Sequence, residues 1–256
     1  MDGWFESEGL RLATHLAMPP GGGRMAANLA GVVLCHGFPA GAGGARTSAS
    51  TYPELADRLA QEVGCAALTF NFRGCGQSEG DFSLGGWLAD LGAAVDHLQK
   101  SAPVGDVWVV GSSTGGSLAI CAAARDERIR GVAALAARAD FDDWASHPRR
   151  FLEHAREMAV IRTAGFPTAF DGWSRELREI RPLQLVTELP PRPLLLVHGS
   201  DDEYVPVADA RVLADAHGAC DLRIIGGASH RLRHDPRAIA VLLGWLDRQS
   251  VRTSPG

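Results

Sequence analysis

The sequence lacks the long apolar run that a membrane-spanning helix requires. Its apolar stretches, such as 29–35, are far shorter than the required length of about 18 residues. The first six residues are acidic in character and contain no apolar core of the kind found in a secretory signal. These absences predict a cytoplasmic protein that has no membrane partner.

Concentrated positive charge and paired cysteines are also missing. The formal net charge is −5, and both signs are scattered along the 256 residues, so we expect no nucleic-acid partner. The five cysteines stand at 35, 65, 75, 121 and 220, without CxxC spacing. They predict reduced and mostly buried thiols, and Cys75, in a predicted loop, is the exception we expect.

The sequence contains no metal-binding pattern that we recognise. His147, Glu153 and His154 lack the HExxH spacing of zinc hydrolases. His230 and His234 form an HxxxH pair, but neither a third ligand nor a helix is evident there. We therefore expect neither a metal nor an organic cofactor.

What the chain does have is length and apolar content, with 46% hydrophobic residues in 256. These values predict one large domain spanning residues 1–256. Strand-like and helical patterns alternate, which is typical of an α/β fold with a mostly parallel central sheet of about eight strands and helices on both faces. We expect strands at 4–7 and 10–18 (an antiparallel hairpin), 31–34, 66–71, 107–110, 131–136, 194–197 and 222–225, and helices at 52–63, 84–98, 116–125 and 236–249.

One segment interrupts this alternation. Residues 140–192 separate two predicted strands by more chain than one crossover helix needs, so we expect a short helical cap there. Its aromatic residues either pack the cap onto the body or line a pocket above the sheet. The pocket candidates are Phe141, Trp144, Phe166 and Trp173. The segments 21–23 and 253–256 are expected to be flexible by composition.

The most informative pattern is GxSxG at 111–115, where a predicted strand becomes a helix. Gly111 and Gly115 allow strand and helix to approach closely, and Ser113 is forced into a strained turn that exposes its hydroxyl. The following helix directs free amides and the positive end of its dipole at the same place, which suits an anionic intermediate. Ser112 lacks flanking glycines. Glycine-rich turns of this kind also bind phosphates, so further residues must support catalysis.

A serine hydroxyl needs a base within hydrogen-bond reach and a third group that orients the base. His230 follows the last predicted strand, at the carboxyl end where catalytic groups of open α/β sheets gather. The acidic run Asp201, Asp202 and Glu203 follows the strand at 194–197, and any of the three can hold the imidazole. The chain order is thus serine, acid, histidine.

With these motifs the chain resembles the α/β-hydrolase superfamily over nearly its whole length, in its small-cap carboxylesterase or serine aminopeptidase-like branch. HGFP at 36–39 resembles the oxyanion loop of that family, RGCGQS at 73–78 its RGxGxS loop, and HGSDDEYVP at 198–206 its HGxxDxxVP acid loop. The resemblance implies Asp202 as the acid, His230 as the base, and the amides of Phe38 and Thr114 as the oxyanion hole. Some relatives instead place the acid at the position of Asp140.

These residues predict a serine hydrolase that cleaves small or aromatic carboxylic esters through an acyl-enzyme intermediate. Amidase, thioesterase, C–C hydrolase and aminopeptidase activities remain open on the same fold, as does a non-catalytic ligand-binding relative. A nucleotide-binding protein is disfavoured, because GxGxxG spacing is absent and Gly131 stands where an acidic residue is expected. Arg46 either pairs with a substrate carboxylate or is a solvated surface arginine. The expected partner is a small-molecule ester, and a homodimer is left open.

Overall fold

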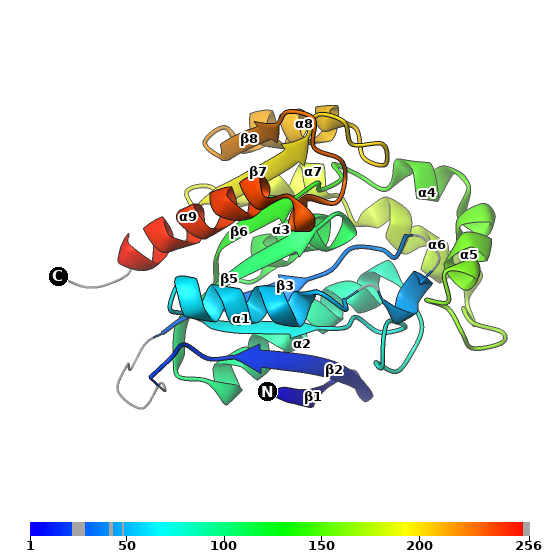
Figure 1. The fold of residues 1–256 in the computed structure, drawn as a ribbon. Helices are drawn as coiled ribbons and strands as arrows, with labels where there is room; N and C mark the ends of the chain where they lie inside the picture. Colours follow the sequence, from blue (N-terminus) through cyan, green and yellow to red (C-terminus); the bar gives the residue numbers. More distant parts are fainter. Residues whose placement is uncertain (22–28, 41–42, 48, 253–256) are drawn as a thin grey trace.

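The protein folds around one sheet of eight strands, in the order β1-β2-β4-β3-β5-β6-β7-β8 (Figure 1). The computed structural model describes residues 1–21, 29–40, 43–47 and 49–252, so most of the two segments expected to be flexible, 22–23 and 253–256, lies outside it. The strands are β1 (Asp2–Ser7), β2 (Leu10–Ala17), β3 (Leu29–Cys35), β4 (Ala66–Phe70), β5 (Val104–Ser112), β6 (Ile129–Leu135), β7 (Leu194–Gly199) and β8 (Asp221–Ile225). Strand β1 pairs antiparallel with β2 and β2 with β4, whereas the remaining pairs are parallel. The predicted α/β-hydrolase fold is confirmed.

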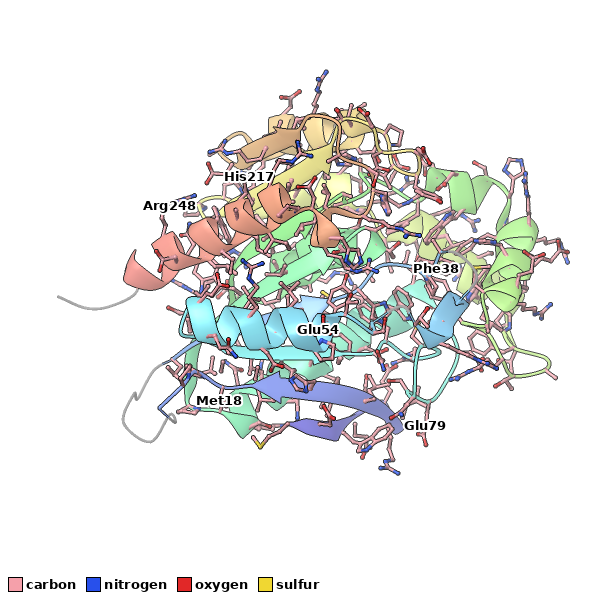
Figure 2. The ribbon with its side chains drawn as sticks, viewed as in Figure 1. Met18, Phe38, Glu54, Glu79, His217 and Arg248 are labelled. Atoms are coloured by element: carbon pink, nitrogen blue, oxygen red, sulfur yellow. The ribbon has the colours of Figure 1, made fainter. Side chains whose placement is uncertain are left out.

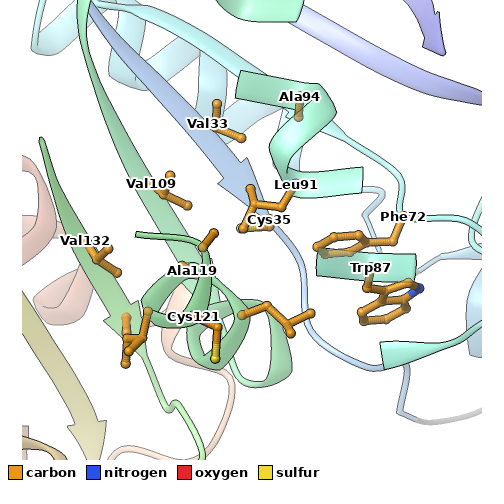
Figure 3. Packing of buried hydrophobic residues seen from close by; sticks show 14 of the residues in the cluster. Val33, Cys35, Phe72, Trp87, Leu91, Ala94, Val109, Ala119, Cys121 and Val132 are labelled. Atoms are coloured by element: carbon orange, nitrogen blue, oxygen red, sulfur yellow. The ribbon is translucent and has the colours of Figure 1, made fainter. Parts of the chain in front are cut away.

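Helices cover both faces of this sheet because alternate strand residues point to opposite sides. On β3, Val32 and Leu34 join a core with α1 (Tyr52–Glu62) and α9 (Pro236–Arg252). Val33 and Cys35 join the opposite core with α2 (Leu84–Ser101), α3 (Thr114–Arg125) and α8 (Val207–His217). Figure 3 shows part of this second core, where Val33 and Val109 face Leu91 of α2. The parallel strands β3, β4, β5, β6 and β7 are therefore buried on both sides over most of their length, whereas the edge strand β8 is partly exposed.

Local signals fix where the long helices begin. The side chain of Ser83 accepts a hydrogen bond from the Gly86 amide at 3.0 Å, which caps α2. Asp235 accepts one from the Arg237 amide at 2.9 Å just before Pro236 opens α9. Helix α8 has no counterpart among the expected helices.

The segment expected to form a cap contains four helices, α4 (Asp142–Ser146), α5 (Pro148–Glu157), α6 (Phe170–Glu179) and α7 (Pro182–Leu185). Figure 1 shows α4, α5 and α6 together beyond one end of the sheet. Aromatic contacts bind them together and to the body. Trp144 of α4 stacks on Phe151 of α5 with ring centroids 4.1 Å apart, and the Trp173 indole of α6 donates to the Phe82 carbonyl at 3.1 Å.

A buried ion pair fixes the loop after β4 to α2. The Arg73 guanidinium donates to both oxygens of Asp90, with the shortest contact at 2.7 Å, and to Glu8 at 2.9 Å. The Asp90 side chain is fully buried, and the Arg73 amide donates to its second oxygen at 2.9 Å. The Nε, Nη2 and backbone amide donors of this arginine therefore help to hold the RGxGxS-like loop in place.

The thiol prediction was right for three buried cysteines and wrong for Cys75. All five cysteines are free, and Cys75 is buried because its loop turns inward, with its amide donating to the Phe72 carbonyl at 2.9 Å. Only Cys220 is half-exposed. Burial raises the pKa of Cys65 and of Cys121 to about 12. Within the described part of the chain, no helix is both long and apolar enough to cross a bilayer.

Candidate active site

Ser113 occupies a strained turn between β5 and α3. Its φ of 51° and ψ of −125° lie where side-chain-bearing residues are rarely found. A Cβ added to Gly111 would lie 2.3 Å from the Gly115 carbonyl oxygen, and one added to Gly115 would lie 2.3 Å from that of His36. Both glycines are thus needed for the close approach of strand, helix and neighbouring loop. Helix α3 begins directly after the serine, two residues earlier than expected.

The loop after β3 packs against this serine. A Cβ on Gly37 would lie 2.8 Å from the Ser113 Cβ, so only glycine fits there. His36 is buried, donates from Nδ1 to the Gly37 carbonyl at 2.8 Å and accepts the Phe72 amide on Nε2 at 3.2 Å. Burial lowers the pKa of His36 to about 4, so the ring stays neutral and orients the loop. The loop carries Phe38 to the pocket beside Ser113.

Asp202 is the acid that contacts His230. Its Oδ2 lies 2.8 Å from the His230 Nδ1, and its side chain is fully buried. The amides of Tyr204 and Val205 both donate to Oδ1 at 2.9 Å. Burial by itself raises the pKa of Asp202, but the hydrogen bonds outweigh it and hold that pKa well below its usual range. The carboxylate is therefore ionised and rigidly placed.

Two histidines share this carboxylate, and their surroundings give them different roles. The His198 Nε2 lies 3.3 Å from Asp202 Oδ2 and 2.9 Å from the Val205 carbonyl. Both partners are acceptors, so this nitrogen carries the proton, and the ring is fully buried. His230 instead donates from Nδ1 to the carboxylate, which leaves its Nε2 unprotonated in the neutral ring. Its side chain is 19% exposed, at the pocket.

One cavity of about 380 Å³ brings Ser113, His230 and Phe38 together. Ser112 also lines it, but among the two serines only Ser113 has the positive φ of the elbow. Thr114 follows Ser113 as the first residue of α3, and its buried hydroxyl has no hydrogen-bond partner within the described structure. Asp202 lies behind His230. The candidate nucleophile and base thus line one pocket, and the candidate acid contacts the base.

The five residues expected to line a substrate pocket lie elsewhere. Phe141 is fully buried and Trp173 is 4% exposed, so both pack in the core. Trp144 lies behind Phe38, with ring centroids 5.3 Å apart, and Phe166 is half-buried beside Arg156, which donates to its carbonyl. None of these lines the serine pocket in the part of the chain that is described.

Arg46 lines a different cavity, of about 710 Å³, beside β1 and β2. Figure 2 labels Phe38, which lies between the sheet and the helices of the expected cap. Its ring contacts Trp144 and Phe151 from that side. The helices therefore reach the serine pocket through Phe38 rather than through their own aromatic side chains.

The pocket also contains residues that the sequence reasoning missed. Tyr204 is 60% exposed, and its ring lies 5.3 Å from that of His230. Arg231 and Arg233 line the cavity directly after the histidine. The alternation HRLRH at 230–234 is the signal that points to them, because Leu232 between the two arginines is buried.

Other candidates do not join this arrangement. The Asp140 carboxylate accepts the Asp142 amide at 2.9 Å, and the acid beside His230 is Asp202. Asp201 is exposed and accepts only from the Ser200 hydroxyl among the contacts that the structure gives it. Over the described residues, no group of three or more His, Cys, Asp or Glu side chains is placed to hold a metal ion.

A protein-family model matches part of the chain. The family model described as the alpha/beta hydrolase fold matches residues 32–181, more than half of the chain. The chain belongs to the α/β-hydrolase family. Its match spans the elbow and the loops around it, whereas Asp202 and His230 lie beyond its end. A search of curated proteins found no match.

Solved structures share the fold at low sequence identity. Est1E from Butyrivibrio proteoclasticus is 21% identical, with 98% of each chain covered and a TM-score of 0.70. GrgF, an alpha/beta hydrolase from Penicillium sp. sh18, is 20% identical, with 98% of this chain and 99% of that chain covered and a TM-score of 0.73. The Pyrococcus furiosus esterase Pf2001 is 18% identical, with 98% of this chain and 91% of that chain covered and a TM-score of 0.69.

Proposed function

We propose that the protein is a cytoplasmic serine hydrolase that cleaves carboxylic esters through an acyl-enzyme intermediate. The observation that carries this proposal is the 2.8 Å contact from His230 to the buried Asp202, in a pocket that also contains the strained Ser113. The carboxylate fixes the tautomer in which His230 presents a basic nitrogen. Cysteines that are free in the structure support the cytoplasmic assignment.

In the proposed reaction, His230 takes the proton from Ser113 as the hydroxyl attacks the ester carbonyl. The amides of Phe38 and Thr114 hold the developing oxyanion, and His230 then gives the proton to the leaving alcohol. Water, activated by the same histidine, hydrolyses the acyl-enzyme. One preorganised oxyanion donor contributes about 3 to 4 kcal/mol, and general base catalysis about 10² to 10⁴ in rate.

A fluorophosphonate probe tests the mechanism, because it reacts only with an activated serine. We expect stoichiometric labelling of the wild-type protein at Ser113, and no labelling of Ser113→Ala or His230→Ala. Labelling that persists in Ser113→Ala would contradict the assignment. A parallel panel of an aryl ester, a thioester and an aminoacyl amide distinguishes the ester proposal from the other activities of this fold.

The substrate class we propose is small or aromatic esters. A cavity of about 380 Å³ lies at the small end of ligand sites, and Phe38 and Tyr204 give it aromatic walls. A structure of Est1E, 21% identical over 98% of each chain, carries bound ferulic acid, an aromatic acid. We expect kcat/KM for aryl esters to fall progressively with acyl length, by about 1 to 3 kcal/mol per methylene that no longer fits. A steady rise to acyl chains of about twelve carbons would show that the class is wrong.

A further inference from the structure

The serine pocket carries positive charge that no protein carboxylate neutralises. Arg231 and Arg233 line it, and among its described lining residues there is no Asp or Glu. The residues of the neighbouring 39–50 loop that the structure does not describe are Gly41, Ala42 and Ser48, and none of them is charged. Asp202 lies nearby but is fully buried and engaged with two histidines. The charge of both arginines is therefore available to a ligand.

Arg233 is held at the pocket wall by contacts that leave its positive charge uncompensated. Its Nε donates to the Thr51 hydroxyl at 3.2 Å, and its guanidinium carbon lies 5.6 Å from the centre of the Tyr52 ring. Thr51 lines the same pocket. Neither contact supplies a negative charge, so the guanidinium is oriented while its terminal nitrogens stay unpaired within the described structure.

Neighbouring groups do not change this balance. Burial lowers the pKa of His234, and the charges of Arg233 and Arg231 lower that pKa further, so His234 is neutral near pH 7. Some other arginines of the described chain have a carboxylate partner: Arg138 contacts Asp143 at 2.7 Å, and Arg128 contacts Asp96 at 2.6 Å. Arg231 and Arg233, which line the serine pocket, have no carboxylate among the contacts that the structure gives them.

We propose that the preferred substrates are esters whose acyl part carries a free carboxylate, which Arg231 and Arg233 bind. The inference rests on the proposed esterase function and names the substrate class of the same pocket. Arginine binds a planar carboxylate through two parallel hydrogen bonds, and such charged contacts are among the stronger ones in proteins. The ester carbonyl then reaches Ser113 while the far carboxylate faces the arginines.

Matched ester pairs test this preference. The 4-nitrophenyl monoester of glutaric acid is compared with 4-nitrophenyl pentanoate, which has the same acyl length and no carboxylate. We expect kcat/KM to favour the anionic ester by about tenfold to a hundredfold, the range given by one or two charged hydrogen bonds. Succinate and adipate monoesters then locate the spacing between the ester and the arginines.

Substitution of the arginines locates the cause of that preference. In R231Q/R233Q, the ratio of the two kcat/KM values should fall to about one, chiefly through a higher KM for the anionic ester. The control Arg211→Gln, at an exposed position on α8, removes a positive charge that does not line the serine pocket and should keep the wild-type ratio. Arg233→Lys keeps the charge but not the planar donor pair, so we expect an intermediate ratio.

The outcomes separate the two proposals. Equal wild-type kcat/KM values for both esters, or a ratio that survives in R231Q/R233Q, would overturn the carboxylate inference while leaving the esterase function intact. Failure to hydrolyse either ester would refute the esterase function itself. Direct binding gives an independent readout: glutarate should raise the melting temperature of Ser113→Ala, and the shift should vanish when R231Q/R233Q is added. Absence of any shift in Ser113→Ala would likewise overturn the inference.

Discussion

Two arginine-containing regions of the molecule are built in opposite ways. Arg73 has a side chain that is 10% exposed, and its Nε and Nη2 donate to the carboxylates of Asp90 and Glu8. Arg233 faces the serine pocket and has a hydroxyl and an aromatic ring as partners instead of a carboxylate. A charge that is paired with carboxylates (saturated) stabilises one loop geometry. A charge without a carboxylate partner (unsaturated) stays available to a ligand. The partners of a charged group, more than its residue type, therefore indicate its role.

The histidines repeat this contrast. Both ring nitrogens of His36 have backbone partners, so the ring has no capacity left for proton transfer. His198 is fully buried, and the proton on its Nε2 is shared between the Asp202 carboxylate and the Val205 carbonyl. His230 uses one nitrogen for Asp202 and keeps the other free to face the pocket. We call the serine pocket, with Arg233 and His230, the unsaturated region, and the Arg73–Asp90 pair together with His36 the saturated region. Substitutions in the unsaturated region should affect activity, and substitutions in the saturated region should affect stability.

The largest effect should come from the nucleophile. Ser113→Ala is expected to lower kcat by about 10⁶, because the serine and histidine act as one unit, while the melting temperature stays near that of wild type. Hydrolysis of an aryl ester measures kcat, and thermal unfolding measures the melting temperature. Ser112→Ala is the matched control and should keep most of the activity. Retention of a tenth of the activity in Ser113→Ala would contradict the assignment of the nucleophile.

The next effect concerns the acid. Asp202→Asn should lower kcat by about 10⁴, because an amide permits the wrong histidine tautomer. Asp201→Asn, at the exposed neighbouring position, serves as the control and should retain activity. The losses in Asp202→Asn and His230→Ala should not add in the double variant. Additive losses would show that these two residues do not work together.

The saturated region should respond in stability. Asp90→Asn leaves the Arg73 charge with Glu8, which is largely exposed, as its one carboxylate partner in the described structure, so we expect a loss of about 3 to 5 kcal/mol in the free energy of unfolding. Asp106→Asn breaks the exposed pair with Arg130 and should cost less than about 1 kcal/mol. Urea unfolding compares the two. Equal losses would mean that burial does not distinguish the two ion pairs.

The fold was largely predictable because its signals are local. Strands that are buried on both faces appear in the sequence as continuous apolar runs. Glycines on both sides of a serine indicate a tight strand-to-helix turn, because a side chain at either position would collide with the neighbouring backbone. Helix α8 was not expected, because it buries only Ala210, Leu213 and His217 and so shows a weak apolar stripe. Cys75 was misplaced because nothing in the local sequence shows that its loop turns inward.

The site was predictable only where a motif fixes the geometry. Asp202 and Asp201 differ in whether the side chain points toward His230, and spacing within a known loop pattern selects the first. Arg46, which was offered as either a substrate-binding or a solvated surface arginine, lines a different cavity, whereas Arg231 and Arg233, which the sequence reasoning did not name, line the serine pocket. Which side chains surround a cavity depends on how loops that are distant in the sequence pack together. The periodicity of the sequence does not predict this packing.

A smaller effect than that of Asp90→Asn is a pH dependence of stability caused by His36. Burial lowers its native pKa to about 4, whereas in the unfolded chain it titrates near the ordinary value of about 6.5. Between these values the unfolded state binds a proton that the native state does not, so stability is complete above about pH 6.5 and falls as the pH drops toward 4, by about 3 kcal/mol in all. His36→Gln keeps an acceptor for the Phe72 amide but cannot titrate. Urea unfolding at several pH values from 7 to 5 should therefore show a shallower decline in His36→Gln than in wild type. Parallel declines would mean that the acid sensitivity resides in other groups and that the saturated ring of His36 makes no contribution to it.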